Sequence, residues 1–203
     1  MSKGRLVLIL GGARSGKSDF AEEMATETAT ELGTRVLFVA TAEARDEEMR
    51  ARIAAHRAAR PPCWRTLEAP WDVGKALAGR KAPAVVLLDC LTLLVSNHLG
   101  RLGSEVPYAD DTYEKVRAAL DRELVELVNW QEASGAHLIV VSNEVGLGLV
   151  PPFPLGRAYR DLLGWANRRL ARRAHEVYLM VAGLPVEVKS LSGRKWQKMQ
   201  SDG

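Results

Sequence analysis

Short apolar runs alternate with amphipathic segments along most of the chain. The apolar runs predict buried strands at residues 5–10, 35–40, 84–89, 137–144 and 176–183, with a shorter strand at 64–68. Segments with a helical period predict helices at residues 17–32, 46–59, 72–78, 111–131 and 159–173. Residues 184–189 are expected to return as an antiparallel strand after a tight turn. This alternation predicts an α/β fold, with a mainly parallel sheet and one antiparallel edge strand.

Glycine, proline and mixed charge mark two predicted loops, at residues 97–111 and 145–154. A chain of 203 residues is long enough to bury a full core as one domain. We therefore expect a single domain over residues 1–189. The basic segment at residues 190–203 is expected to be a poorly ordered tail.

Charge and cysteine content narrow the class of protein. The 28 basic and 25 acidic residues leave a net charge of +3, a small excess that does not favour a nucleic-acid partner. The two cysteines form no C-x-x-C pair, which is typical of a reduced, cytoplasmic setting. No apolar run reaches membrane-spanning length, and no signal peptide fits the start of the sequence. The sequence therefore predicts a cytoplasmic protein with no membrane span.

The segment GGARSGKS at residues 11–18 fits the phosphate-loop pattern G-x-x-x-x-G-K-[ST]. It follows a predicted strand and opens a predicted helix, which is the context that this motif requires. Glycines let backbone N–H groups face phosphate oxygens, and Lys17 can reach the β- and γ-phosphates of a nucleotide. The motif predicts a nucleotide site formed by Gly11, Gly12, Ala13, Arg14, Ser15, Gly16, Lys17 and Ser18.

Two oxygen donors are candidates for binding Mg²⁺ beside the nucleotide. Ser18 belongs to the phosphate loop, and Asp89 ends the clearest predicted strand. Glu144 ends another strand and is a weaker second candidate. The residues around Glu144 do not fit N-K-x-D, the pattern with which switch GTPases bind guanine.

His56 lies on the helix predicted at residues 46–59, one turn after Arg52 and one turn before Arg60. This helix follows a strand whose carboxyl end is expected near the phosphate loop. Imidazole is a nucleophile toward phosphorus, and neighbouring guanidinium groups bind phosphate charge. His56 is therefore a candidate catalytic residue, although a structural histidine fits the same spacing.

Taken together, these stretches resemble the family of bifunctional adenosylcobinamide kinase / adenosylcobinamide-phosphate guanylyltransferase of cobalamin biosynthesis. The resemblance covers roughly residues 6–189. Its most specific part is the pattern R-I-x-x-H-[RK]-x-x-R-P at residues 52–61, followed by W-R-T at 64–66. The stretches LLDCLTLLVSN at 87–97 and VVSNEVGLGLVP at 140–151 also match.

The resemblance implies an enzyme that phosphorylates adenosylcobinamide with ATP or GTP. The enzyme then transfers GMP from GTP to adenosylcobinamide phosphate through a GMP–histidine intermediate. That histidine corresponds to His56, because the preceding position, a second histidine in some members, is Ala55 here. The family also implies a homotrimer with a three-layer, RecA-like phosphate-loop fold.

Beyond the phosphate loop, the resemblance implies further nucleotide contacts. These contacts map to Ala40, Thr41, Ala42, Arg57, Arg60, Glu68 and Asp89. With His56 and Lys17 as catalytic residues and Ser18 and Asp89 at Mg²⁺, they complete the expected site.

Two other functions remain open from the residues alone. A monofunctional small-molecule kinase needs the phosphate loop and Asp89 but gives His56 only a structural role. A RecA-like nucleotide-dependent protein that acts on nucleic acid also needs the phosphate loop, but the small net charge disfavours it.

Overall fold

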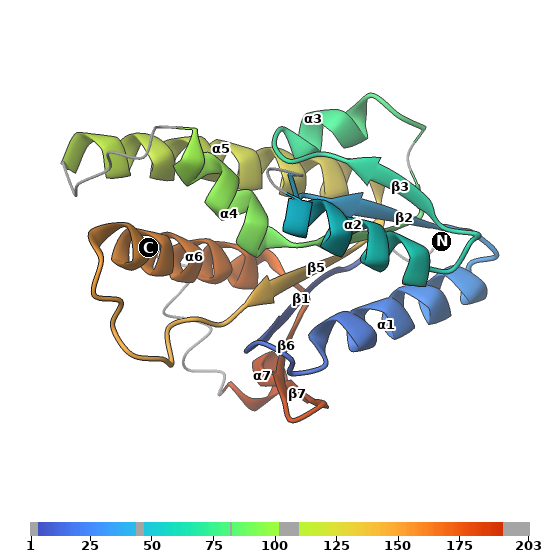
Figure 1. Cartoon of the computed structure of the whole chain (residues 1–203). Coiled ribbons are helices and arrows are strands. Elements are labelled where there is room, and N and C mark those ends of the chain that lie inside the picture. Colours follow the sequence, from blue (N-terminus) through green and yellow to red (C-terminus); the bar gives the residue numbers. More distant parts are fainter. Residues whose placement is uncertain (1–3, 44–46, 82, 102–109, 193–203) are drawn as a thin grey trace.

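The computed structural model describes residues 4–43, 47–81, 83–101 and 110–192, which form one sheet with helices on both faces (Figure 1). The strands are β1 Leu6–Gly11, β2 Val36–Ala40, β3 Arg65–Glu68, β4 Val85–Asp89, β5 His137–Asn143, β6 Glu176–Val181 and β7 Leu184–Glu187. The helices are α1 Lys17–Glu31, α2 Glu47–Ala59, α3 Val73–Ala78, α4 Leu91–Gly100, α5 Asp110–Ser134, α6 Pro154–Arg173 and α7 Val188–Leu191.

The strand order is β3-β2-β4-β5-β1-β6-β7. All neighbouring pairs are parallel except β6 and β7, which pair antiparallel at one edge. Parallel strands require crossover connections, and the helices between them supply these. The predicted fold class is therefore confirmed: the sheet is mainly parallel, one antiparallel strand lies at its edge, and helices cover it on both sides.

Alternate residues of the central strands fill two apolar layers. Leu8, Val39 and Leu88 point toward α3, α4, α5 and α6, and they belong to the larger core. Ile9 and Phe38 point to the opposite face, where the alanines of α1 pack closely against them. Since both faces are covered, the strands read as nearly continuous apolar runs, as a parallel sheet requires.

Helix α4 corrects the loop predicted at residues 97–111. The helix continues to Gly100, α5 already begins at Asp110, and residues 102–109 lie outside the described part of the chain. Leu91, Leu94 and Val95 are fully buried in the larger core. The apolar segment after β4 is thus a buried helix. Because this helix has no polar face, its sequence shows no helical periodicity.

Helix α6 begins at Pro154, earlier than the start predicted at residue 159. Proline is tolerated in the first turn of a helix, because its missing N–H has no partner within the helix there. The predicted loop between β5 and α6 is otherwise confirmed. The proposed division of the chain at residue 189 stays a prediction, although α7 extends to Leu191.

Candidate active site

The predicted site residues gather at the carboxyl edge of the sheet. The register aligns Ala40 at the end of β2 with Glu68 of β3 on one side and with Asp89 of β4 on the other. In the same sheet, Gly11 at the end of β1 aligns with Asn143 of β5. Ligands of open α/β sheets bind at this edge, so the sequence-based site lies where the fold favours one.

The phosphate loop connects β1 to α1 (Figure 1). Gly16 precedes the first helical residue with φ of 86°, in the left-handed region that favours glycine. The Lys17 ammonium group reaches back over the loop and donates to the Gly12 carbonyl at 3.0 Å. The N-terminus of α1 therefore points its N–H groups and a lysine toward the same small space, as binding of phosphate requires.

Two backbone hydrogen bonds hold this loop in place from outside. The Gly183 N–H, in the turn between β6 and β7, donates to the Ser15 carbonyl at 3.1 Å. The Glu144 N–H, just after β5, donates to the Gly11 carbonyl at 3.0 Å. Sequence reasoning missed both supports, because backbone contacts between distant segments leave no residue-type signal.

Ser15 packs against Gly11 inside the loop. A Cβ on Gly11 would lie 2.4 Å from the Ser15 hydroxyl oxygen, so only glycine fits there. That hydroxyl is buried and has no hydrogen-bond partner among the described residues. A buried hydroxyl without a partner is costly, and a phosphate oxygen is an acceptor that would satisfy it.

Asp89 lies between the phosphate loop and the end of β2. The charge of Lys17 acts on the neighbouring Cys90 thiol, which places this lysine near the end of β4. Mg²⁺ in nucleotide sites usually takes one or two protein oxygens together with phosphate oxygens. The carboxylate of Asp89 and the hydroxyl of Ser18, at the start of α1, are oxygen donors of this kind.

Thr41 ties the end of β2 to the residue after β4. Its side chain is fully buried, and its hydroxyl donates to the Cys90 carbonyl at 2.7 Å and accepts from the Cys90 N–H at 2.8 Å. Its own carbonyl accepts from the Asn97 amide at 2.8 Å. The Thr41 hydroxyl is thus hydrogen-bonded within the protein. Its neighbours Ala40 and Ala42 lie at the same edge of the sheet.

Arg60, after α2, lies over the ring of Phe38, with its guanidinium carbon 3.4 Å from the ring centroid. The Arg60 side chain is half-buried, and burial lowers the pKa of its guanidinium. The negative charges of Asp89 and Glu22 oppose this shift, so the guanidinium lies within electrostatic reach of both. The structure therefore brings Arg60 together with Asp89 and with α1.

Helix α2 carries Arg57 at the surface of the molecule. Its described side chains are exposed, except Ile53, which is half-buried. Arg57 forms an ion pair of 3.9 Å with Glu68 at the end of β3, so these two predicted nucleotide contacts lie together. The backbone of His56 is helical, one residue before Arg57, and its side chain lies outside the described part of the structure.

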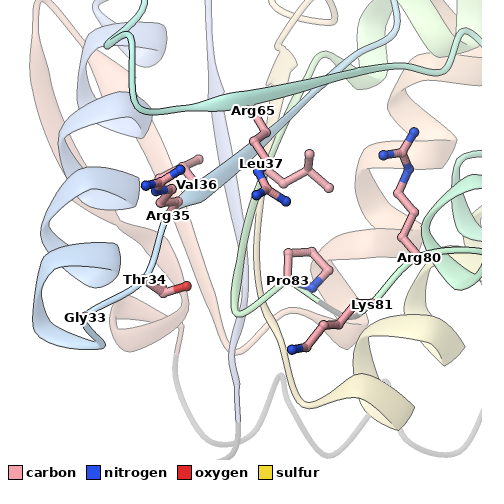
Figure 2. Close-up of a pocket in the computed structure, with 9 residues that line it drawn as sticks. All are labelled: Gly33, Thr34, Arg35, Val36, Leu37, Arg65, Arg80, Lys81 and Pro83. Carbon is pink, nitrogen blue, oxygen red and sulfur yellow. The ribbon is translucent and has the colours of Figure 1, made fainter.

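A separate hollow of about 570 Å³ opens at the opposite, amino-terminal edge of the sheet (Figure 2). Its cationic side chains are Arg35, Arg65, Arg80 and Lys81, and Arg65 reaches over Leu37 toward its centre. Val36 and Leu37 lie at the start of β2, whereas Ala40, at the candidate site, lies at the other end of the same strand. This hollow is therefore not the phosphate site.

A family model described as cobinamide kinase / cobinamide phosphate guanyltransferase (CobU) matches residues 7–188. The chain belongs to this family. Cobinamide kinase and cobinamide phosphate guanyltransferase are a kinase and a nucleotidyltransferase, so the chain is a transferase that uses nucleotides. The family assignment confirms the resemblance that the pattern around His56 and the phosphate loop predicts.

Three relatives carry related names. Two are called bifunctional adenosylcobalamin biosynthesis protein CobU, from Escherichia coli K12 (37% identical) and Salmonella typhimurium LT2 (38% identical). The alignment with each covers 91% of this chain and 99% of the relative. The third, bifunctional adenosylcobalamin biosynthesis protein CobP of Pseudomonas aeruginosa PAO1, is 43% identical over 90% of this chain and 96% of its own.

Among solved structures, the fold is similar to a KaiC-like protein of Pyrococcus horikoshii OT3. The TM-score is 0.45 at 17% identity, over 88% of this chain and 72% of that one. No described helix of the present chain is both long enough and apolar enough to cross a membrane.

Proposed function

We propose that this chain phosphorylates adenosylcobinamide with ATP or GTP and then transfers GMP from GTP to the resulting phosphate. The observation that carries the proposal is the meeting of two elements at one sheet edge. One is the phosphate loop, where the Lys17 ammonium group donates to the Gly12 carbonyl. The other is the α2–β3 segment, which brings Arg57 and Arg60 toward Glu68 and Asp89.

In the transfer reaction, an imidazole nitrogen of His56 attacks the α-phosphorus of GTP, and the bond to the pyrophosphate oxygen breaks. Lys17 and the loop N–H groups stabilise the charge of the leaving pyrophosphate. Arg57 and Arg60 neutralise the α-phosphoryl oxygens. The phosphate of adenosylcobinamide phosphate then displaces the imidazole, which returns His56 to its free form. Two successive displacements predict ping-pong kinetics.

In the kinase reaction, the acceptor hydroxyl attacks the γ-phosphorus and the nucleoside diphosphate leaves. Positioning and charge supply most of the rate in this chemistry, so Lys17 and the loop amides carry it without a covalent intermediate. Mg²⁺, held by Ser18 and Asp89, would neutralise charge on the phosphates. The covalent step, and with it the role of His56 as nucleophile, is therefore unique to the transfer reaction.

Labelling tests this proposal directly. The protein is incubated with Mg²⁺ and GTP labelled at the α-phosphate, denatured, and separated from free nucleotide. We expect protein-bound label that is lost in acid, survives alkali and is absent from His56→Ala. An unlabelled protein that still binds GTP would instead support a monofunctional kinase.

We further propose that the chain works in the cytoplasm as a homotrimer and does not bind nucleic acid. Support for assembly comes from the β6–β7 hairpin and α7, where Val181, Leu184 and Leu191 are exposed apolar side chains. Sedimentation equilibrium should give three times the mass of the 22.3 kDa chain. A monomer at all concentrations would contradict this state.

A further inference from the structure

The segment between β5 and α6 has an unusual composition for a surface loop. Residues 145–156 read VGLGLVPPFPLG and contain no charged side chain. Loops of soluble proteins usually carry polar residues, because water solvates them. We call residues 144–153 the β5–α6 loop.

The β5–α6 loop begins beside the phosphate loop. Strand β5 lies between β1, which leads into the phosphate loop, and β4, which ends at Asp89. The hydrogen bond from the Glu144 N–H to the Gly11 carbonyl fastens the first residue of this segment to the nucleotide side of the site. In Figure 1 the segment extends outward from the carboxyl end of β5, at the same edge as the turn between β1 and α1.

Large apolar side chains on this segment point into solvent. Leu147 is 86% exposed, Leu149 96%, Val150 63% and Phe153 73%. Such side chains are normal on a surface when they occur singly, but four within seven residues form a patch. Exposed apolar patches mark sites where a ligand or another surface binds.

The backbone that displays this patch is held in place. The Glu144 carboxylate accepts from the Gly146 N–H at 2.5 Å. The Arg157 guanidinium donates to the carbonyls of Pro151 and Pro152, at 3.1 Å and 2.7 Å. A loop fixed in this way loses little conformational freedom when a ligand covers it, which favours binding.

We propose that the β5–α6 loop binds the corrin ring of the acceptor substrate. This inference rests on the proposed function. A corrin is a broad macrocycle with methyl groups and neutral amide arms, so its faces suit an uncharged apolar patch. The phosphates of the nucleotide do not fit this apolar patch, because they require the cationic groups of the phosphate loop.

Position supports the same occupant. The acceptor hydroxyl must reach the γ-phosphate beside Lys17, while the much larger ring has to rest outside the phosphate loop. The β5–α6 loop is fastened to Gly11 at one end and extends away from it, which matches that requirement. Leu149 and Phe153 would contact the ring, and the glycines at 146 and 148 leave room for its approach.

The test compares Leu149→Ser and Phe153→Ser with the parent protein and with Leu32→Ser. Leu32 is the matched control, because it is an exposed leucine that follows the far end of α1, at the opposite edge of the sheet. The dissociation constant of adenosylcobinamide is measured by equilibrium dialysis at saturating non-hydrolysable ATP analogue. Labelling by GTP and the sedimentation mass are measured on the same samples.

We expect the two loop variants to weaken adenosylcobinamide binding about ten- to hundredfold. GTP labelling, nucleotide affinity and mass should not change, and Leu32→Ser should behave like the parent. These side chains are exposed, so their replacement does not remove packing from the core.

Three results would overturn the inference. Unchanged adenosylcobinamide binding in both loop variants would show that the ring rests elsewhere, while the proposed function stands. A change of mass that accompanies the weaker binding would assign the patch to a second copy of the chain. A parent protein that does not bind adenosylcobinamide at all would refute the proposed function together with this site.

Discussion

The hydroxyl of Thr41 bonds both backbone polar groups of Cys90. It donates to the carbonyl at 2.7 Å and accepts from the N–H at 2.8 Å. Thr41 follows β2 and Cys90 follows β4, so this one buried side chain joins two strand ends at the candidate site. The position of Asp89, which comes directly before Cys90, depends on this link.

Thr41→Val should therefore destabilise the protein. Valine has a similar shape but leaves the Cys90 N–H without a partner, which costs about 1–3 kcal/mol. The Cys90 carbonyl still accepts from the Leu94 N–H at 3.3 Å. We expect the free energy of unfolding, measured by urea denaturation, to fall by an amount in this range. Thr41→Ser keeps the hydroxyl and should lose clearly less. An unchanged stability of Thr41→Val would contradict this role of the hydroxyl.

How much of this arrangement the sequence predicts depends on the kind of signal. The phosphate loop and Asp89 were predictable, because a motif and apolar runs that end in polar residues mark them. The link between Thr41 and Cys90 was not, since a threonine after a strand reads equally well as a ligand contact. Its partner is set by the order of β2 and β4 in the sheet.

Helix α4 shows the same limit for the fold. Its apolar residues have no polar stripe, so they carry no helical period, and the glycine and charges that follow it favoured a loop. Asn97, inside the predicted loop, is in fact buried and donates to the carbonyls of Thr41 and Pro70. An asparagine that donates hydrogen bonds to carbonyls of two separate segments can be recognised only once the tertiary structure has brought these segments together.

Lys17→Ala should abolish both activities and leave the fold intact. The ammonium group lies over the phosphate loop, where it donates to the Gly12 carbonyl. Removal of one such charge from a phosphoryl-transfer site lowers the rate by about 100-fold or more. Kinase turnover and GTP labelling should fall together, with an unchanged melting temperature. Lys75→Ala, which removes a surface lysine paired with Asp72, serves as control. A normal kinase rate in Lys17→Ala would mean that the phosphates bind elsewhere.

Gly16→Ala should lower both stability and nucleotide affinity. Gly16 has φ of 86°, a conformation that costs other residues about 1–2 kcal/mol, and a Cβ there would lie 3.2 Å from the Gly183 Cα. The strain would displace the turn between β6 and β7, whose Gly183 N–H holds the phosphate loop through the Ser15 carbonyl. The matched variant is Gly164→Ala, in the middle of α6, where a Cβ meets nothing within 4 Å. That change should stabilise the protein by up to about 1 kcal/mol. Calorimetry and nucleotide titration compare the two, and equal effects would contradict the assignment.

The two cysteines should differ in reactivity and in their effect at high pH. Cys63 is exposed, whereas burial raises the pKa of the Cys90 thiol from 9.0 to about 12, with the charge of Asp89 adding to the shift. A thiol reagent at pH 8 should modify one cysteine in the native protein and both after denaturation.

The raised pKa of Cys90 also sets the sign of a stability change. The unfolded chain releases this proton near pH 9.0, while the folded protein retains it to about pH 12. The free energy of unfolding should therefore fall as pH rises through this window. Cys90→Ala should remove the part of the decline that begins at pH 9. The part due to Tyr159 and Tyr178, whose pKa values burial raises from 10.0 to about 12, should remain.

His56→Ala should separate the two activities of the enzyme. The proposed kinase reaction needs Lys17 and the phosphate loop but no covalent intermediate, so its rate should stay within about threefold of the parent. GMP transfer needs the imidazole as nucleophile and should fall by about a thousandfold or more. The two rates are measured separately, with adenosylcobinamide and ATP for the kinase and with preformed adenosylcobinamide phosphate and GTP for the transfer.

The control for this separation is Arg50→Ala on the same helix. Arg50 is exposed and pairs with Glu47, so its loss tests whether a change in α2 by itself disturbs either reaction. We expect both rates to stay normal. Loss of kinase and transfer together in a folded His56→Ala protein would show that α2 acts in both reactions. The separate nucleophilic role of His56 would then have to be abandoned, because a shared defect points to nucleotide binding.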